Sequence, residues 1–275
     1  MKNIGPLFTI VVPILNQHQT TADIMDSWFT LCKNRLSVIF IDNNSDELLS
    51  DQPFIKEWSK FHDIRVIRND KNVGVYPTFQ QGFELVHGSK FIFYSHNDVE
   101  MIELGWDEKM GRILRSLHDE SRLPGVCGMF GADGIGTPDI YKAPYDFRQM
   151  MRWNCHTVES MVGAGGESVI QDFTPCMVLD GFSLITSIDM INSVGGFHHE
   201  DYPVHHMYDN DICLASHYAG FRNYIIDIDC KHHGGVTSTR ETWAEEMGTT
   251  DLAVHRKAHT VFYEKWRGKL PISVA

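Results

Sequence analysis

The sequence predicts an α/β fold with a mostly parallel central sheet and helices on both faces. Residues 1–105 alternate between short β-branched or aromatic runs and longer segments whose apolar residues recur at helical spacing. Segments in this order form βαβ units, whose right-handed crossovers bring successive strands side by side in parallel. The chain has 275 residues, 43% of them hydrophobic, so it can bury a core without disulfides or a structural metal.

The first part of the chain contains four predicted strands separated by helices. Thr20 or Thr21 can cap the first helix, because a threonine hydroxyl accepts a hydrogen bond from the first turn, and Ile24, Trp28 and Leu31 then share one face. We expect strands at residues 8–13, 37–41, 64–67 and 90–94, and helices from about residue 20 and over 47–61, 76–86 and 106–117.

The second part is less regular. Residues 124–166 are rich in glycine and dotted with proline, and their periodicity predicts no element. We expect strands at 182–185 and 224–228, a short helix after the first of these, a helix at 212–219, and a helical segment at 242–266 broken around Gly248. Residues 1–241 are therefore expected to form one domain with two halves, 1–105 and 106–241, and 242–275 a C-terminal helical extension.

Composition excludes several classes of protein. The formal net charge is −12, from 36 acidic and 24 basic residues, which disfavours general nucleic-acid binding because phosphate contacts need clustered lysine and arginine. The longest apolar run, Phe8–Leu15, is far shorter than the roughly 20 residues that span a bilayer. Met1–Pro6 carries one lysine and no signal-like apolar core, so we expect a cytoplasmic protein without a membrane span.

Polar residues follow three of the predicted strands, at Pro13–Asn16, Asp42–Ser45 and Ser95–Asp98. The carboxyl ends of parallel strands meet at one edge of a sheet, where ligands bind in a crevice. A carboxylate such as Asp98 at that edge can hold Mg²⁺ or Mn²⁺ against a diphosphate, because these ions prefer oxygen ligands. The alternative for an aspartate in a loop is a cap or turn residue.

Further segments extend this pattern over nearly the whole chain, except residues 124–174. They are Asn72-Val73-Gly74, His96-Asn97-Asp98, Asp180-Gly181, the Tyr208–Leu214 run, and His232-His233-Gly234-Gly235 with Ser238. Their order and spacing resemble those of the nucleotide-sugar glycosyltransferases of family 2, which have the GT-A fold. His96-Asn97-Asp98 falls where the family has its DxD metal motif, and Tyr208–Leu214 resembles its acceptor-side Glu-Asp-x-Asp-Leu motif.

The resemblance implies a nucleotide-sugar donor bound by the half formed by residues 1–105. Asp42 would accept a hydrogen bond from the nucleobase, whereas an Asx-turn with Asn43–Ser45 is the alternative for this residue. Asp42 alone does not separate a UDP sugar, which we expect, from a dTDP or GDP sugar. The residues expected to bind the donor are Pro13, Leu15, Asn16, Asp42, Asn72, Gly74, His96 and Asn97.

The resemblance also implies a metal-assisted displacement. Asp98 would bind the Mn²⁺ or Mg²⁺ ion that offsets the charge on the leaving diphosphate, with His232 as a further ligand and His233 as its substitute. Asp209 would be the general base that takes a proton from the acceptor hydroxyl in an inverting displacement. Asp180, Gly181 and Tyr208 would bind the acceptor. The alternative for Asp209 and Asp211 is a helix N-terminal carboxylate, the role we expect for Asp211.

Three departures from the family pattern affect the expected affinity for a metal ion and the expected identity of the general base. His96 replaces the first acid of DxD, Tyr208 replaces the glutamate before the catalytic aspartate, and Ala215 replaces a common arginine. The other histidine pairs lack the ligand spacing of a structural zinc site, and we expect residues 198–206 at the rim of the acceptor pocket.

Two alternative functions use the same sheet. A phage-type transferase would glycosylate a hydroxymethyl-pyrimidine in DNA, which the net charge of −12 disfavours relative to a glycan, lipid-linked or other hydroxyl acceptor. A sugar-phosphate nucleotidyltransferase would need a basic, glycine-rich loop after the first strand, whereas residues 16–19 carry no lysine or arginine. The sequence does not identify the sugar, the acceptor, the oligomeric state or the role of residues 124–174.

Overall fold

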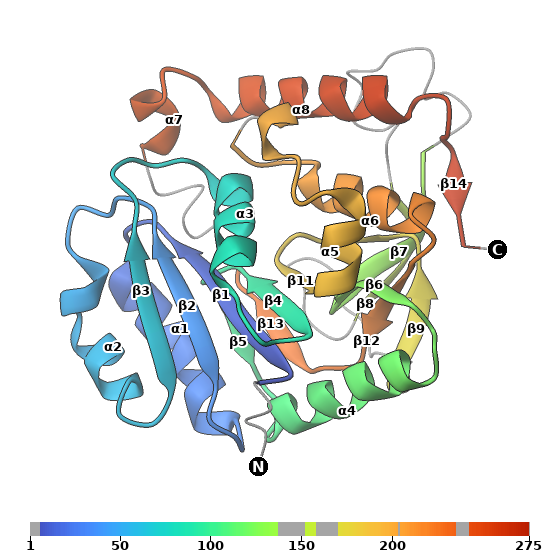
Figure 1. Cartoon of the computed structure of the whole chain (residues 1–275). Coiled ribbons are helices and arrows are strands. Elements are labelled where there is room, and N and C mark those ends of the chain that lie inside the picture. The colour runs from blue at the N-terminus through green and yellow to red at the C-terminus, as the bar shows by residue number, and fades with distance from the viewer. Residues whose placement is uncertain (1–5, 137–151, 158–169, 203, 235–241, 275) are drawn as a thin grey trace.

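An eight-stranded sheet crosses the middle of the molecule (Figure 1). The computed structural model describes residues 6–136, 152–157, 170–202, 204–234 and 242–274. In spatial order the strands are β3 (Asp63–Arg68), β2 (Ser37–Asp42), β1 (Phe8–Ile14), β4 (Phe91–Ser95), β11 (Ser183–Ser187), β6 (Pro124–Gly128), β12 (Arg222–Ile226) and β9 (Phe173–Cys176). The first four are parallel, β12 is parallel to β6, and β11 and β9 are antiparallel to their neighbours. This mostly parallel sheet confirms the predicted fold class.

Two smaller sheets flank the main one. β7 (Phe130–Ile135) pairs with β10 (Val178–Leu179), β14 (Ile272–Ser273) and β8 (Arg152–Thr157), and β5 (Val99–Met101) pairs with β13 (Cys230–His232). Of these six strands the sequence predicted none, because each is short or takes its partner from a distant part of the chain.

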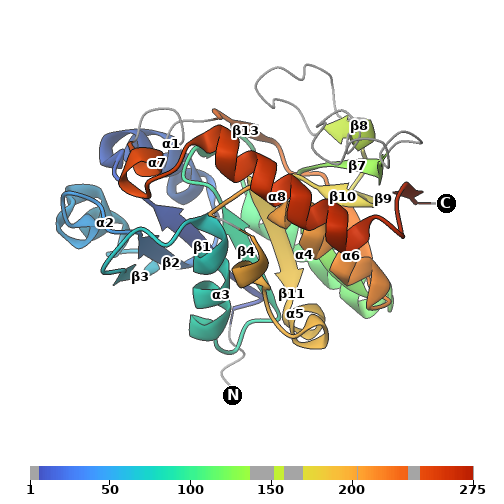
Figure 2. The same ribbon diagram turned by 90° about the horizontal axis from the view of Figure 1, so that it is seen from above.

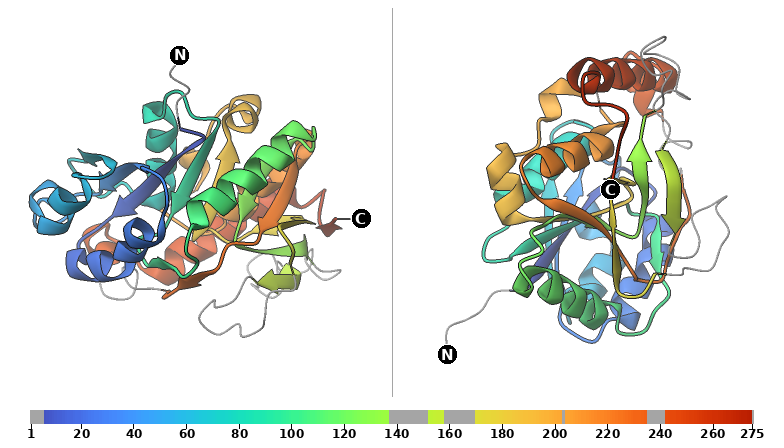
Figure 3. Two further views of the ribbon diagram at one scale, coloured as in Figure 1. Left: turned by 90° about the horizontal axis from the view of Figure 1, so that it is seen from below. Right: turned by 90° about the vertical axis from the view of Figure 1, so that its right-hand side faces the viewer.

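Helices cover both faces of the main sheet. They are α1 (His18–Leu31), α2 (Pro53–Trp58), α3 (Val75–Leu85), α4 (Trp106–Asp119), α5 (Ile188–Val194), α6 (Tyr208–Tyr218), α7 (Trp243–Glu246) and α8 (Asp251–Trp266), with short 3₁₀ turns η1 (Leu49–Asp51) and η3 (His199–Asp201). Seen from above, α8 runs across the near side of the molecule (Figure 2), and seen from below, α4 lies on the near side (Figure 3). No helix in the described part of the chain is long and apolar enough to cross a membrane.

Alternation along the strands separates two cores. In β1, Ile10 and Val12 face a core shared with α1, α2 and α4, whereas Val11 faces a core shared with α3, α5, α6 and α8. Successive side chains of a strand point to opposite faces, so a run of apolar residues buries both faces of a central strand. This is why the opening strand lacks a polar side.

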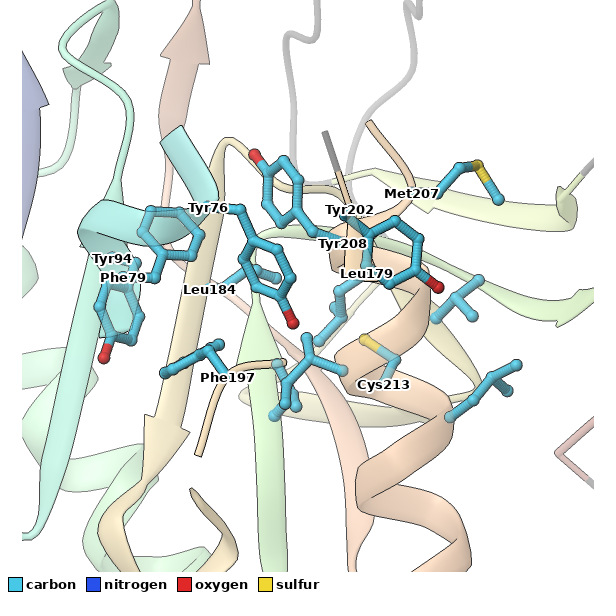
Figure 4. Close-up of a cluster of buried hydrophobic side chains, with 14 of the residues drawn as sticks. Tyr76, Phe79, Tyr94, Leu179, Leu184, Phe197, Tyr202, Met207, Tyr208 and Cys213 are labelled. Atoms are coloured by element: carbon cyan, nitrogen blue, oxygen red, sulfur yellow. The ribbon is translucent and has the colours of Figure 1, made fainter. Parts of the chain in front are cut away.

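Aromatic side chains join α3 to α6 within the second core (Figure 4). The rings of Tyr76 and Tyr208 stack with centroids 5.2 Å apart, and Phe79 meets Tyr208 edge-on at 5.4 Å. Phe197 and Tyr202 contact Tyr76 edge-on. The cluster therefore fixes the start of α6 against a helix that belongs to the first half of the chain.

A buried carboxylate joins α6 to α8. The side chain of Asp211 is 1% exposed and accepts hydrogen bonds from Trp266 Nε1 at 2.6 Å, Tyr202 Oη at 2.9 Å and Lys265 Nζ at 3.0 Å. Asp211 lies in the first turn of α6, as expected from the sequence. In addition to lying near the positive end of the α6 dipole, the carboxylate binds side chains of α8 and of the loop before α6.

Two local expectations differ from the structure. The helix expected at 47–61 is shorter, because Pro53 starts α2 and the residue before a proline avoids the helical conformation; Gln52 is extended, with ψ 136°. The threonine cap of the first helix is wrong, since α1 begins at His18 behind a left-handed Gln17 without a side-chain cap. Thr21 instead accepts a hydrogen bond from Asn97 at 2.8 Å.

The C-terminal segment consists of α7 and α8 on either side of Gly248, as predicted. Phe262 and Trp266 of α8 are buried in the second core, and Ile272 of β14 pairs with Ile135 of β7. The division of the chain into a domain at 1–241 and an extension at 242–275 stays a prediction.

Removing the Asp211 carboxylate should destabilise the fold. We expect Asp211→Ala to lower the free energy of unfolding by about 3–5 kcal/mol, because the buried donors of Trp266 and Tyr202, together with the partly exposed Lys265, lose their acceptor. Asp201→Ala is the control: its carboxylate is half exposed and lies 3.8 Å from the same lysine nitrogen, so its loss should cost less than about 1 kcal/mol. Urea denaturation measures both, and equal losses would contradict the role given to Asp211.

Protonation of His62 should make stability depend on pH. Its Nδ1 accepts a hydrogen bond from the Leu36 N–H at 3.2 Å, and burial, with Arg35 adding to it and Asp107 opposing it, lowers its pKa below the usual 6.5. Below pH 6.5 the unfolded chain binds a proton that the folded chain binds less readily, so stability falls as pH falls through this range.

His62→Gln keeps an acceptor for the Leu36 N–H but does not titrate. The difference in unfolding free energy between about pH 7.5 and about pH 5.5 should be smaller in His62→Gln than in the unchanged protein. An unchanged difference would show that His62 protonates equally in both states.

Candidate active site

A cavity of about 590 Å³ opens at the carboxyl ends of β1 and β4, a volume typical of small-molecule sites. It is lined by twelve of the fourteen residues that the sequence singled out: Pro13, Leu15, Asn72, Gly74, His96, Asn97, Asp98, Asp180, Gly181, Tyr208, Asp209 and His232. Residues separated by more than two hundred positions in the chain thus meet at one edge of the sheet, where βαβ folds bind ligands.

The pairing of β5 with β13 brings Asp98 and His232 together. Asp98 ends the loop after β4, and the antiparallel register places His232 opposite Val99, the next residue. His232 Nε2 lies 3.2 Å from Asp98 Oδ1, and His96 Nδ1 lies 4.0 Å from the same oxygen. The three ligand atoms all lie within 4.8 Å of one another. His96, expected only as a donor contact, is therefore part of this group, which we call the His96 cluster.

The adjacent histidine points elsewhere. His233 Nε2 lies 2.9 Å from Glu100 Oε2, and its backbone N–H donates to the Asp98 carbonyl at 2.9 Å. Because successive side chains of a strand alternate, only one of the two imidazoles can face Asp98. The structure thus brings His232, and not His233, to the Asp98 carboxylate.

Burial keeps the His96 cluster in a form suited to a cation. Desolvation lowers the pKa of His96, with Asp98 opposing this and His232 adding to it, so the ring is neutral at pH 7. A neutral imidazole has a lone pair for a metal ion. His96 Nε2 lies 3.1 Å from Tyr208 Oη, and the His232 ring stacks on Phe182 at 4.7 Å. These contacts orient both rings beside a carboxylate that is 4% exposed.

Asp209 lies in the first turn of α6, on the wall of the same cavity. Its Oδ2 accepts a hydrogen bond from the Gly181 N–H at 3.1 Å, and its Oδ1 accepts one from Asn210 N–H at 2.8 Å. Glycine is required at 181, because a Cβ there would lie 2.5 Å from Tyr208 Oη. The Asp180-Gly181 turn therefore holds both the carboxylate and the tyrosine that contacts His96.

The loop before α3 is fixed against the loop before α6. Gly74 has φ 88°, and a Cβ on it would lie 2.8 Å from the Val204 backbone. The N–H groups of Val75 and Tyr76 both donate to the Val204 carbonyl, at 3.0 and 3.2 Å. Gly74 is needed both for its left-handed backbone and for this close approach.

Two predicted donor-binding residues do not line the cavity. The carboxylate of Asp42 is 1% exposed, accepts a hydrogen bond from the Ser45 N–H at 2.8 Å and forms an ion pair with Arg68. Asn16 joins the ends of β1 and β2, since its N–H donates to Ser45 Oγ and its Oδ1 accepts from the Asp46 N–H. The hydrogen bond from the Ser45 N–H to Asp42 is the one expected for an Asx-turn. The contact of Asp42 with a nucleobase stays a prediction.

Sequence reasoning missed two residues at this end of the site. Asn43 lines the cavity, donates to Asn72 Oδ1 at 2.8 Å, and accepts from the Val73 N–H at 3.0 Å. Arg68 ends β3 and fixes Asp42. Asn43 lies in the polar stretch after the second strand but was considered only as part of a turn with Asp42, and Arg68 ends the third strand, which is not among the polar strand ends identified from the sequence.

Histidines from two distant segments line another part of the cavity wall. They are His205 and His206 from the loop before α6 and His255 and His259 from α8, together with Asp251 and Trp243. Desolvation lowers the pKa of all four imidazoles, that of His259 to about 4. Ser238 and Gly235, expected near His232, lie outside the described residues, as do 137–151 and 158–169 of the 124–174 segment.

The chain resembles known proteins in sequence and in fold. Residues 9–143 match the family model of glycosyl transferase family 2. A search of curated protein sequences finds no match. Solved structures that resemble the chain, among them the three described below, have sequence identities of 9% to 13%, a level that shows the fold alone.

Three of these structures illustrate the similarity. The chain superposes on GalNAc-T7 bound to UDP, GalNAc and Mn²⁺ with a TM-score of 0.58 and 11% identity, over 84% of this chain and 44% of that one. The mannosyltransferase PcManGT of Pyrobaculum calidifontis, bound to GDP-Man and Mn²⁺, superposes with a TM-score of 0.54 and 13% identity, over 96% of this chain and 70% of that one. Residues 1–349 of S. aureus TarS superpose with a TM-score of 0.56 and 11% identity, over 96% of this chain and 72% of that one.

The chain thus spans less than half of GalNAc-T7 and about 70% of the other two proteins. The family match covers the strands and the Ser95–Asp98 loop that build the cavity, and the structural matches extend over the remaining elements. The chain is a glycosyltransferase family 2-like protein with the GT-A fold.

Proposed function

We propose that the chain transfers one sugar from a nucleotide-sugar donor to a hydroxyl acceptor and inverts the anomeric configuration. The observation that carries the proposal is the convergence of the His96 cluster and Asp209 on one cavity at the strand ends. One group can hold a cation beside a diphosphate, and the other can accept a proton from an attacking hydroxyl. Both are needed for such a transfer, and together they combine residues from both halves of the chain.

The residues of the His96 cluster fit a divalent cation. Two imidazole nitrogens and one carboxylate oxygen lie within 4.8 Å of one another, and such a mixed set suits Mn²⁺ better than Mg²⁺, which prefers oxygen alone. A bound cation would offset, as a Lewis acid, the negative charge that develops on the leaving nucleoside diphosphate. The Mn²⁺ ions in the GalNAc-T7 and PcManGT structures support this assignment.

The donor nucleoside is proposed to bind where Pro13, Leu15, Asn43, Asn72 and Gly74 line the cavity. Proline and leucine offer apolar surface to a base, and the two asparagines offer amide groups to the ribose or base. Asp42 precedes Asn43 in the chain, and its ion pair with Arg68 lies outside the cavity lining. We propose a UDP sugar as the donor because the similar structures of GalNAc-T7 and TarS contain UDP and UDP-GlcNAc, respectively.

Asp209 is proposed as the general base. Asp209 lies in the first turn of α6, where the partial positive charge of the helix N-terminus favours an acidic side chain. The Gly181 N–H holds one carboxylate oxygen in place. As Asp209 takes the acceptor proton, the hydroxyl oxygen attacks the anomeric carbon on the face opposite the leaving diphosphate, and a single displacement of this kind inverts the configuration.

Nucleotide binding should raise the thermal unfolding temperature only with the cation. We expect UDP with Mn²⁺ to stabilise the chain by about 2.7 kcal/mol at 100 times its dissociation constant, and dTDP, GDP and CDP to stabilise it less. The part of the shift in unfolding temperature that depends on Mn²⁺ should disappear in Asp98→Asn and in His232→Gln. His233→Gln is the matched control, because its side chain contacts Glu100 instead of Asp98. Equal shifts with and without Mn²⁺ would refute the metal site, and no shift with any nucleotide would refute the donor site.

Asp209→Asn should slow the reaction while leaving donor binding intact. We expect kcat for hydrolysis of the UDP sugar, in which water replaces the acceptor, to fall roughly 10²–10⁴-fold with little change in KM. Release of UDP measures the rate, and Asp201→Asn, a half-exposed carboxylate outside the cavity lining, serves as the control.

Proton NMR of the sugar first released gives the stereochemistry. An α-linked donor should yield the β-sugar first, and release of the α-sugar would contradict an inverting displacement. An unchanged kcat in Asp209→Asn would exclude this residue as the base.

A further inference from the structure

We infer that His205, His206 and Asp251 form a second divalent-cation site, with a preference for zinc-like ions, on the wall of the same cavity. This inference does not depend on the proposed transfer reaction. In the described residues these three side chains and the His96 cluster are the two groups of metal-ligating atoms that lie within 4.8 Å of one another. The two groups share no residue, so each can be tested without the other.

The geometry matches a zinc site before any ion is present. Nε2 of His205 lies 3.0 Å from Asp251 Oδ1, and Nε2 of His206 lies 3.1 Å from the same oxygen. A tetrahedral zinc ion with ligands at 2.0–2.1 Å holds its ligand atoms roughly 3.3 Å apart. Two of the three ligand separations are thus close to those of a tetrahedral site, and small rotations of the side chains would complete it.

The backbone holds the two imidazoles in place at an energetic cost. Val204, His206 and Met207 all have positive φ, at 54°, 73° and 61°, a conformation that costs non-glycine residues about 1 kcal/mol or more each. The loop is nevertheless fixed at both ends, because the Val204 carbonyl accepts two hydrogen bonds from α3 and Met207 is buried. Strained backbone that the surrounding fold enforces is found mainly at binding and catalytic sites.

The third ligand comes from a separate, equally well-defined element. Asp251 is the first residue of α8, and the Thr250 side chain caps this helix by accepting a hydrogen bond from the Ala253 N–H at 3.2 Å. One helical turn later, the His255 ring lies 4.3 Å from that of His206, and His259 follows at 4.5 Å from His255. The His255 ring therefore packs behind the three ligands, and a water molecule would complete a four-coordinate site.

The chemistry of the ligands selects the ion. Imidazole nitrogen binds Zn²⁺, Co²⁺ and Ni²⁺ more readily than Mg²⁺ or Ca²⁺, which prefer carboxylate, carbonyl and water oxygens. A simple hydrogen-bonded arrangement would need only one imidazole beside the carboxylate, whose side chain is 60% exposed. Two imidazoles directed at one oxygen atom, with a third ring behind them, are better explained by a metal site.

A cation here would join α8 to the loop that precedes Asp209. His205 and His206 are followed directly by Met207, the residue before α6, so an ion bound to Asp251 would fix the entry to that helix. Figure 1 shows α7 and α8 lying across the molecule above α3 and α6. The proposed site would thus secure the C-terminal segment over the cavity.

Cobalt titration tests this site directly. The full chain, without an affinity tag and stripped of metal, is titrated with Co²⁺ in an Asp98→Ala background, so that the His96 cluster cannot produce the signal. We expect one Co²⁺ per chain with the visible absorption bands of a four-coordinate ion, and displacement of Co²⁺ by Zn²⁺. His205→Ala/His206→Ala and, separately, Asp251→Asn should weaken cobalt binding by roughly 100-fold or more, since losing a ligand costs more than losing an outer-shell partner.

The control variant removes a histidine and aspartate pair of the same geometry elsewhere. His118 Nδ1 lies 3.1 Å from Asp119 Oδ1 on the surface of α4, with no third ligand in the described residues, so His118→Ala/Asp119→Asn should leave cobalt affinity unchanged. If the double histidine variant fails to fold, Asp251→Asn decides the question, because its side chain is largely exposed. Absence of a bound cobalt in Asp98→Ala, or equal affinity in Asp251→Asn, would overturn the inference.

Discussion

The buried carboxylate of Asp211 holds together the parts of the molecule that surround the cavity. A negative charge that is withdrawn from water is stable only if donors replace the water, and here a lysine, a tryptophan and a tyrosine do so. These donors come from α8 and from the loop before α6, while the carboxylate belongs to α6. One set of hydrogen bonds therefore sets the position of Asp209, two residues earlier, and of the helix that carries Asp251.

The cavity itself depends on a second constraint, the three-residue pairing of β5 with β13. Most ligand groups at the edge of a parallel sheet come from loops that directly follow neighbouring strands. His232 instead reaches Asp98 because its strand pairs with the segment that follows Asp98. A shift of one residue in this register would direct His233 to the carboxylate and turn His232 away, since side chains alternate along a strand. Pairing of only three residues a side is sufficient because both strands also contribute to the core.

The sequence predicted the parts of the fold that follow local rules. The four parallel strands of the first half and α3, α4 and α8 lie within a few residues of their expected positions, because hydrophobic periodicity and breakers such as Gly248 determine them locally. The short strands β5, β7 and β13 could not be predicted, because their stability comes from partners far away in the chain. The expected helix at 47–61 was too long because Pro53 was not treated as a start signal.

The same distinction applies to the site. Asp98, Asp209 and His232 were found through a resemblance in motif order, and the structure brings them into one cavity. His96 was assigned only to the donor, although it occupies the first position of the metal motif. The cluster of His205, His206 and Asp251 was missed for a physical reason: its ligands are forty-five positions apart, so no spacing rule for a local zinc motif could detect it.

The contact between Gly74 and Val204 limits how the two halves of the chain can vary. The α-carbon of residue 74 lies so close to the Val204 backbone that no side chain fits between them, and the same carbonyl caps the start of α3. The loop beside the proposed donor site and the loop that leads into α6 are therefore a single steric unit. Grafting residues 106–241 onto the donor half of another transferase would preserve the cavity only if that half also has a glycine at this position.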